Sequence, residues 1–492
     1  MKREDILQAY EAGPEAVVAL VEQLLANHAE QLARLVAAHQ AQVAELTARI
    51  ERLEARLKSD SHNSHKPPSS DGPAKLPPRR SQRRRSGKKS GGQVGHPGAT
   101  LRQVDQPDTV VSHRAATCAQ CGTSLAQGVV IGQERRQVVD LPATRPQVTE
   151  HQALQVCCPH CQSVSAGAFP VEVTQPVQYG PGVKALAVYL QTYQHLPFER
   201  TQEYFRDVHQ LILSEGTLAT AHATCAAAVV PIETAIREAL LQAAVVHFDE
   251  TGLRLLCLTY WLHVASTARL TYYALQPQRA GPAMQAIGIL PVFQGVAVHD
   301  ALGGYFTYAC GHSLCNAHLL RDLTAVSELT RQRWPARLMA LLLKIKAAVA
   351  RAVVKGQTHL PARRLKDFTA QYDHWVKSGL RANPPPQPTG RVGRPTQGPI
   401  RSLLLRLKKH PTAVLAFMHN FAVPFDNNQA ERDVRMVKIK QKVSGCFRSL
   451  AGAQSFCRIR GYLSTMRKQG HNALAVLTSI FEGHPTMPQL TA

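Results

Sequence analysis

The stretches Ala244-Val-Val-His-Phe-Asp249 and Gly295-Val-Ala-Val-His-Asp300 decide the fold expected of this chain of 492 residues. Each is a short apolar run that ends in an aspartate, a pattern typical of a buried strand. Strand patterns at 260–265 and 270–274 and a helical pattern at 281–289 lie between them. We therefore expect an α/β core that holds Asp249 and Asp300 at strand ends, on a rigid rim open to substrate. Either aspartate alone could equally be a turn residue.

A third acid lies far downstream, in Asp426-Asn-Asn-Gln-Ala-Glu431-Arg-Asp-Val-Arg435. Residues 427–442 predict a basic helix, with Asp426 or Asn427 as its cap and Glu431 one turn in. Glu431 and Arg435 could also form only an ordinary i,i+4 pair.

Two neighbouring acids compete for these roles. Glu250 follows Asp249 and is expected on the opposite face of the strand. Asp433 lies two positions after Glu431, so it is expected to point away from it and to face solvent. Asp249, Asp300 and Glu431 are therefore the candidate catalytic and metal-binding residues. Such carboxylates suit Mg²⁺, and two ions can stabilise the attacking and leaving oxygens of a phosphoryl transfer.

The charge of the chain points to a polyanionic partner. Lys and Arg number 57 against 34 Asp and Glu, a formal net charge of +23. A Ser-, Pro- and Gly-rich segment at 61–100 carries a basic cluster and predicts a flexible linker that follows the DNA backbone, or only a solvated tether. The candidate DNA-binding residues are Arg83, Arg84, Arg85, Lys88, Lys89, Arg432, Arg435, Lys438, Lys440 and Lys442.

Two Cys-x-x-Cys knuckles predict a structural zinc site. The proposed ligands are Cys118, Cys121, Cys158 and Cys161, and Cys157 is expected to be spare. The intervening stretches 136–142 and 148–156 predict strands, so we expect a small β-rich module. Cysteine clustered in this way in a long chain favours metal binding over disulfides, and therefore a reducing cytoplasm.

The N-terminal segment 15–58 predicts one long helix with a heptad repeat. Leucines recur at d positions, and Val36, Val43, Ile50 and Leu57 at a positions, which favours a parallel two-stranded coiled coil. The alternative is an amphipathic helix packed on its own protein. No secretory signal is visible, and no apolar run reaches the roughly 20 residues of a membrane span.

Residues 180–245 predict a helical module. A helix at 198–208, a break near 213–216 and a helix at 217–228, with Ser214 as its cap, could form a helix-turn-helix that reads DNA. The second helix has neither Lys nor Arg. An ordinary helical packing module is therefore an equal alternative.

The combined motifs resemble the transposases of the insertion-sequence 66 family. The resemblance is carried by Asp249-Glu-Thr-Gly, Asp300-Ala-Leu-Gly-Gly-Tyr and the run from Asn427 to Arg435. It extends to Gly92-Gln-Val-Gly-His-Pro-Gly98, the paired knuckles and Cys315-Asn-Ala-His318-Leu-Leu-Arg321. The chain departs from the family pattern after Glu431, where Gln441-Lys442-Val443-Ser444 replaces the usual basic-Lys-Asn element.

The resemblance implies a ribonuclease-H-like core with an Asp-Asp-Glu triad. Asp249, Asp300 and Glu431 would bind two Mg²⁺ or Mn²⁺ ions, water would nick the transposon end, and the freed 3′-hydroxyl would attack target DNA. Cys315 and His318 could hold a metal or position the site. A non-catalytic DNA-binding regulator and a metal-dependent nuclease without strand transfer are the alternatives.

We therefore expect a multidomain α+β protein that acts on transposon ends and target DNA. We expect a homo-oligomer, a dimer formed through the N-terminal coiled coil. Accessory transposition proteins could be further partners, and no association with a membrane is expected. Its expected place is the bacterial cytoplasm, at the nucleoid. The expected segments are a coiled coil (1–60), a basic linker (61–100), a zinc-binding module (101–175), a helical module (176–242), the first part of the catalytic core (243–310), a helical insertion (311–425) and the completion of the core (426–492).

Overall fold

The computed structural model describes residues 3–141, except 58–100, and residues 144–491, except 257 and 386–397. The chain divides into two compact units. The first comprises Met1–Leu76, Gly180–Pro197 and Ala219–Ala492, and the second comprises Pro77–Tyr179 and Phe198–Leu218.

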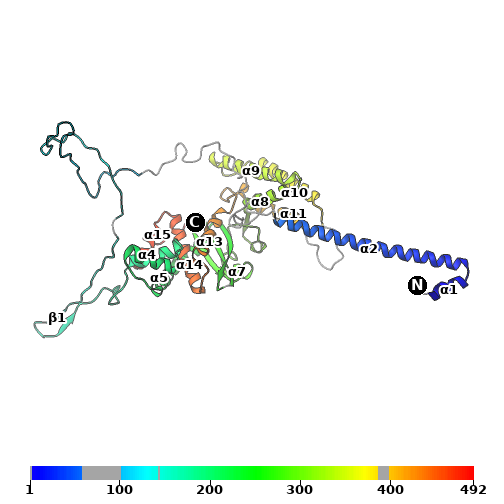
Figure 1. Cartoon of the computed structure of the whole chain (residues 1–492), viewed down its shortest axis with the longest axis horizontal. Coiled ribbons are helices and arrows are strands. Elements are labelled where there is room, and N and C mark those ends of the chain that lie inside the picture. The colour runs from blue at the N-terminus through cyan, green and yellow to red at the C-terminus, as the bar shows by residue number, and fades with distance from the viewer. Residues whose placement is uncertain (1–2, 58–100, 142–143, 257, 386–397, 492) are drawn as a thin grey trace. The chain divides into compact units, whose positions relative to one another are not determined.

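The N-terminal segment is helical, as its heptads predict. Helix α1 spans Arg3–Glu11, and α2 spans Pro14–Leu57 as one continuous helix (Figure 1). Gly13 separates the two with a φ of 109°, which a residue with a side chain rarely adopts. The described a and d side chains of α2 are exposed, including Leu32 and Val36, so α2 carries an uncovered apolar seam.

The second unit contains less strand than the sequence predicts. Strand β1 (Gln155–Cys157) pairs antiparallel with β2 (Val164–Ala166), and helix α4 spans Phe198–His209. The strands predicted at 136–142 and 148–156 are wrong for the described residues before Gln155. Val138 and Val148 are about nine-tenths exposed, at 93% and 88%, so these valines have no apolar surface to pack against.

The core of the first unit is a five-stranded sheet in the order β5-β4-β3-β6-β7. Strands β5, β4 and β3 are antiparallel, whereas β6 runs parallel to β3 and β7 runs parallel to β6. The predictions at 260–265 and 270–274 are confirmed, but β7 lies in a stretch expected to be helical. The strands are β3 (Val245–Leu255), β4 (Leu258–Ser266), β5 (Thr271–Gln276), β6 (Val296–His299) and β7 (Gly311–Leu314).

The sequence pattern predicts that this strand ends at Asp249, but β3 extends beyond that residue. It continues to Leu255 because β4 pairs with it from His247 to Leu255. Strand β6 pairs with β3 only at Val245, Val246 and His247. Asp249 therefore lies in the middle of β3, just beyond its pairing with β6, whereas Asp300 does follow the last residue of β6.

Helices cover both faces of this sheet. On one face, Val246 and Phe248 pack with Ala297 against α6 and α14, and on the other, Leu253 and Leu255 pack against α13. The helices of the core are α3 (Pro181–Val188) with the π-helical turn η2 (Tyr189–Tyr193), α5 (Glu215–Ala228), α6 (Val230–Leu241), α7 (Pro282–Ile287), the 3₁₀ turn η3 (Gly303–Thr307), α13 (Asn428–Ser444), α14 (Leu450–Lys468) and α15 (Ala473–Phe481). Ser214 accepts a hydrogen bond from the Thr217 backbone N–H, so it caps α5 as expected.

Between β7 and α13 the chain forms a helical group with its own apolar core. Trp334, Leu338, Tyr372 and Leu404 are buried together in it, with Phe417 from a later helix. Its helices are α8 (Asn316–Leu329), α9 (Trp334–Val354), α10 (Ala362–Ala382), α11 (Pro399–Lys409) and α12 (Pro411–His419).

No single helix among the described residues is long and apolar enough to cross a membrane. The pair α5 and α6 passes that test only jointly, with a 45° bend between its members. Several of their apolar side chains, including Cys225, Ile232 and Ile236, are buried in the core of the sheet.

Candidate active site

The alternation of β3 places Asp249 on the side of the sheet that faces α13. His247 and Asp249 share the face of Leu253, which packs against that helix, while Phe248 and Glu250 lie on the other. The parallel register joins His247 to Val298. Continued by two residues, that register sets Asp249 beside Asp300, so the two acids meet where the pairing of β3 and β6 ends.

The start of α13 is held against β3 by the fully buried side chain of Asn427. Its amide Nδ2 donates to the Phe248 carbonyl at 2.7 Å, and its Oδ1 accepts from His247 Nδ1 at 2.8 Å. The Asn427 backbone N–H donates to Cys315 Sγ at 3.2 Å. Asn427 thus ties α13 to β3 and to the start of α8. Of the two expected caps, Asn427 occupies the cap position without a side-chain cap bond, and Asp426 before it accepts from the Asn428 N–H at 3.3 Å.

One turn into α13, Glu431 reaches the other acids through His318 of α8. His318 Nδ1 lies 2.6 Å from Asp300 Oδ1, and its Nε2 lies 3.6 Å from Glu431 Oε1. Glu431 Oε1 is buried and, among the described residues, accepts no hydrogen bond. A buried oxygen of this kind suits a cation, because an unsatisfied carboxylate is costly in a low-dielectric environment.

The electrostatics of the cluster also favour a cation. Burial raises the pKa of Asp249 well above its ordinary range, and the negative charges of Asp300 and Glu250 raise it further. Ligand atoms of Asp300, Cys315 and His318 lie within 4.8 Å of one another. Hard oxygen donors suit Mg²⁺ or Mn²⁺. The residues present therefore fit a divalent ion held by the acids, with His318 and Cys315 beside it.

Glu250, the competitor of Asp249, is a structural residue on the opposite face. Its Oε1 accepts from Arg279 Nε at 3.0 Å and Nη2 at 2.9 Å, and its Oε2 accepts from the buried Tyr305 hydroxyl at 2.7 Å. Glu250 lies on the opposite face, as the sequence predicts. Its charge is already paired with that of Arg279.

Asp433 does point away from Glu431, but the expectation that it faces solvent is wrong. It is buried, and its Oδ2 pairs with Lys468 Nζ at 2.9 Å. Lys468 also donates to the carbonyls of Thr267 and Leu270, so it anchors α14 to the start of β5. Asp433 therefore helps fix α13 on the sheet.

The basic side chains of α13 divide into two groups. Arg435, Lys438 and Lys442 are exposed and recur at helical spacing from Glu431, and Arg432 is exposed beside them. Lys440 is half-buried, its Nζ lies 3.9 Å above the Phe447 ring, and burial lowers its pKa to about 8. The predicted linker contacts Arg83, Arg84, Arg85, Lys88 and Lys89 lie outside the described residues.

The two cysteine knuckles have matching backbone turns. The Cys118 N–H donates to the Thr123 carbonyl, and the Cys158 N–H donates in the same way to Ser163. Cys158, not Cys157, is therefore the counterpart of Cys118.

The thiols of these knuckles are suited to zinc. Hydrogen bonds with Thr123 and Ser163 lower the pKa values of Cys121 and Cys161, respectively, to about 7, which favours the thiolates that bind zinc. Across the described residues, the two knuckles do not approach within coordination distance of each other, so each is a preformed half of a site.

Sequence reasoning missed the residues that support the acids. Arg279 carries no motif, Tyr305 closes the segment that begins at Asp300 without an expected role, and the sequence suggested Asn427 as a helix cap. The spacing of Cys315 and His318 was a usable signal, because three residues on a helix bring both side chains to one face.

The comparisons with known proteins identify the family of the chain. Residues 176–455 match the family described as "Transposase IS66 family", and residues 115–162 match the "zinc-finger binding domain of transposase IS66". Residues 9–102 match a family of unknown function, DUF6444. Among curated proteins no significant match is found. Because the first family covers more than half of the chain, the chain belongs to the IS66 transposase family, and the second match supports a structural zinc.

The crowding of acids predicts an unusual stability effect. Asp249→Asn removes a buried charge that has no cationic partner among the described residues, so we expect the metal-free protein to gain roughly 1 kcal/mol or more in free energy of unfolding. Urea denaturation in the presence of a chelator measures this. The matched control is Asp322→Asn, because Asp322 pairs with Arg406 at 2.6 Å, and this change is expected to destabilise. A loss of stability in Asp249→Asn would contradict the electrostatic account.

The knuckles predict which cysteines bind metal. We expect the protein to bind one Co²⁺ in the zinc site with a thiolate charge-transfer band, and Cys118→Ser to weaken that binding by more than about 100-fold, since a direct ligand is lost. Cys157→Ser is the control, because Cys157 belongs to β1 and lies outside the knuckle turn. Equal effects of the two substitutions on the cobalt spectrum would exclude this ligand set.

Proposed function

We propose that the protein is a DNA transposase that nicks transposon ends and joins the freed 3′-hydroxyl to target DNA. The observation that carries the proposal is that Asp300 and Glu431 both lie beside His318, while the register of β3 and β6, continued by two residues, sets Asp249 next to Asp300. The family to which the chain belongs supports the same chemistry. Its net charge of +23 suits a DNA substrate.

In this proposal Asp249, Asp300 and Glu431 are the ligands of two Mg²⁺ or Mn²⁺ ions. When bound, such ions stabilise the attacking and leaving oxygens of an in-line displacement. The chain's own contribution is to hold the three carboxylates, which the sheet and Asn427 position, and to orient Asp300 through its hydrogen bond with His318. A positioning role for His318 and Cys315 is supported by their contacts with Asp300 and Asn427.

The order of the strands supports a ribonuclease-H-like core. Three antiparallel strands are followed by two parallel ones, and the first two acids lie on β3 and directly after β6. The helical group between β7 and α13 would then be an insertion that separates Glu431 from the first two acids in sequence.

DNA would be bound along α13. Arg432, Arg435, Lys438 and Lys442 are exposed on the helix that carries Glu431, so phosphates beside the cleavage point would meet them. Lys438 and the half-buried Lys440 are weaker candidates, because the Lys438 ammonium group already donates to the Gly252 carbonyl and that of Lys440 lies against Phe447. The linker residues between Arg83 and Lys89 would add contacts that are independent of sequence.

The exposed seam of α2 supports a homodimer through a parallel coiled coil. Its apolar a and d residues have no partner among the described residues, and a second copy of the same helix would cover them. Accessory transposition proteins would join such an assembly.

The chemistry is tested by Asp249→Asn. We expect strand cleavage to fall by at least about 1,000-fold, while DNA binding remains within a few-fold, because only a metal ligand is removed. The assay follows a labelled duplex of the DNA end that flanks the gene, with Mg²⁺ or Mn²⁺, and scores nicked and joined products. Asp367→Asn, at an exposed position of α10, is the matched control.

Three outcomes would contradict the transposase assignment. Cleavage that persists in Asp249→Asn would contradict the assignment of the three catalytic acids. Cleavage without joined products would identify a nuclease. DNA binding without cleavage by the unaltered protein would identify a regulator.

The coiled coil is tested by charge substitution on α2. Val36→Asp places a carboxylate at an a position, where it would be buried between two helices, so we expect dissociation of the dimer. Sedimentation equilibrium measures the mass. Ala38→Asp, at the outward c position, should leave the dimer intact. A dimer that survives Val36→Asp would require a different interface.

A further inference from the structure

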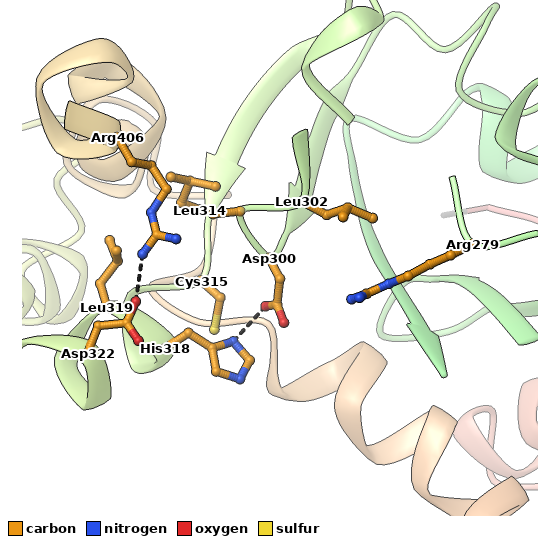
Figure 2. Close-up of a pocket in the computed structure, with 10 residues that line it drawn as sticks. Arg279, Asp300, Leu302, Leu314, Cys315, His318, Leu319, Asp322 and Arg406 are labelled. Carbon is orange, nitrogen blue, oxygen red and sulfur yellow. Dashed lines mark hydrogen bonds and ion pairs between the residues drawn. The ribbon is translucent and has the colours of Figure 1, made fainter. Parts of the chain in front are cut away.

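A cavity of about 340 Å³ opens at the candidate active site, between the end of the sheet and the first helix of the helical group, and Asp300, Cys315 and His318 line part of it. Leu302, Leu314 and Leu319 give it apolar walls (Figure 2). Arg279 and Arg406 enter it from opposite sides. Pockets for small ligands measure roughly 300–1,000 Å³, so this cavity has room for a single small unit and not for a duplex.

The two arginines differ in what they can offer a ligand. Arg406 Nη2 pairs with Asp322 at 2.6 Å, and both side chains are mostly buried. The Arg279 side chain is 50% exposed, although its partner Glu250 is only 2% exposed. Arg279 is therefore the cation that the cavity presents to an incoming group.

Arg279 is held rigidly in a way that leaves donors unused. Glu250 Oε1 accepts from Nε and Nη2, and the guanidinium carbon lies 5.0 Å from the centre of the Trp261 ring. Nη1 makes no hydrogen bond to any described residue. The Tyr305 hydroxyl donates to the other oxygen of Glu250 and so helps fix the carboxylate that orients the guanidinium group. A planar, oriented guanidinium is the group that binds phosphate best in proteins.

We propose that this cavity binds one nucleotide of the DNA strand next to the scissile phosphate, with Arg279 on its phosphate and the leucines against its sugar and base. The inference rests on the proposed function, because Asp300 marks where the strand is cut. It assigns Glu250, Tyr305 and Trp261 a purpose that the three acids do not explain: they position Arg279.

The test uses labelled duplexes of the flanking DNA end, each with one neutral methylphosphonate in place of a phosphate near the cleavage point. Binding is measured in an Asp249→Asn background, so it does not depend on catalysis, and cleavage is measured separately in the unaltered protein. We expect one linkage to weaken binding by about tenfold, the effect of losing a charged hydrogen bond. Arg279→Gln should weaken the binding of unmodified DNA by the same factor. In that variant, a methylphosphonate at the same linkage should cause no further loss of affinity.

Two further proteins separate phosphate recognition from folding. Arg351→Gln, an exposed arginine in the last turn of α9, removes the same charge and should keep the sensitivity of the parent protein. Arg279→Gln combined with Glu250→Gln avoids an unpaired buried acid, so its melting temperature should return toward that of the parent while sensitivity stays absent. An abasic site at the same nucleotide should also weaken binding, because the leucine walls lose their contact.

The outcomes distinguish this inference from the proposed function. If the loss of affinity caused by Arg279→Gln multiplies with the loss caused by a methylphosphonate at every position, Arg279 does not bind any of these phosphates. That result would overturn the inference even if the protein transposes DNA. If the abasic site has no effect, the nucleotide pocket is wrong. If the unaltered protein fails to cleave but the coupling at Arg279 is found, the phosphate site stands and the proposed chemistry fails.

Discussion

The arrangement of the site depends on the buried amide of Asn427. Its Nδ2 bonds the backbone of β3 at Phe248, directly before Asp249, and its backbone N–H bonds Cys315 at the start of α8. One residue, through its side chain and its backbone N–H, therefore fixes a strand and two helices that are far apart in sequence. Because a buried amide is costly unless its hydrogen bonds are made, this junction has little freedom to shift, and Glu431 inherits its position one turn later.

A second constraint is the sorting of negative charge. Glu250 is paired with Arg279 and Tyr305, and Asp433 is paired with Lys468, so both are structural acids. Asp300 and Glu431 instead lie on either side of His318, and burial together with the charge of Asp300 raises the pKa of Asp249. The fold pairs Glu250 and Asp433 with basic side chains but gives Asp249, Asp300 and Glu431 no Lys or Arg partner among the described residues. This arrangement favours binding of a metal cation by the three acids.

Much of the fold could be predicted from local pattern, and the failures have physical causes. The apolar runs before Asp249 and Asp300 are strands, but β3 continues past Asp249 because β4 supports it from the other side. Strand β7 was missed because four residues, Gly311–Leu314, show no periodicity. The strands predicted in the zinc-binding module do not form before Gln155, where the valines are exposed and do not pack against other apolar side chains of the described residues. Asp433 was misjudged because its partner Lys468 lies on another helix.

By itself the sequence determined the candidate acids, the two knuckles, the long heptad helix and the family resemblance, since these depend on residue type and spacing along the chain. Only the tertiary structure decided which neighbouring acid is structural, that His318 bridges Asp300 and Glu431, and that Arg279 and three leucines surround a cavity beside them. Those facts depend on contacts between segments far apart in sequence, and no local pattern encodes the distance between two side chains on different elements.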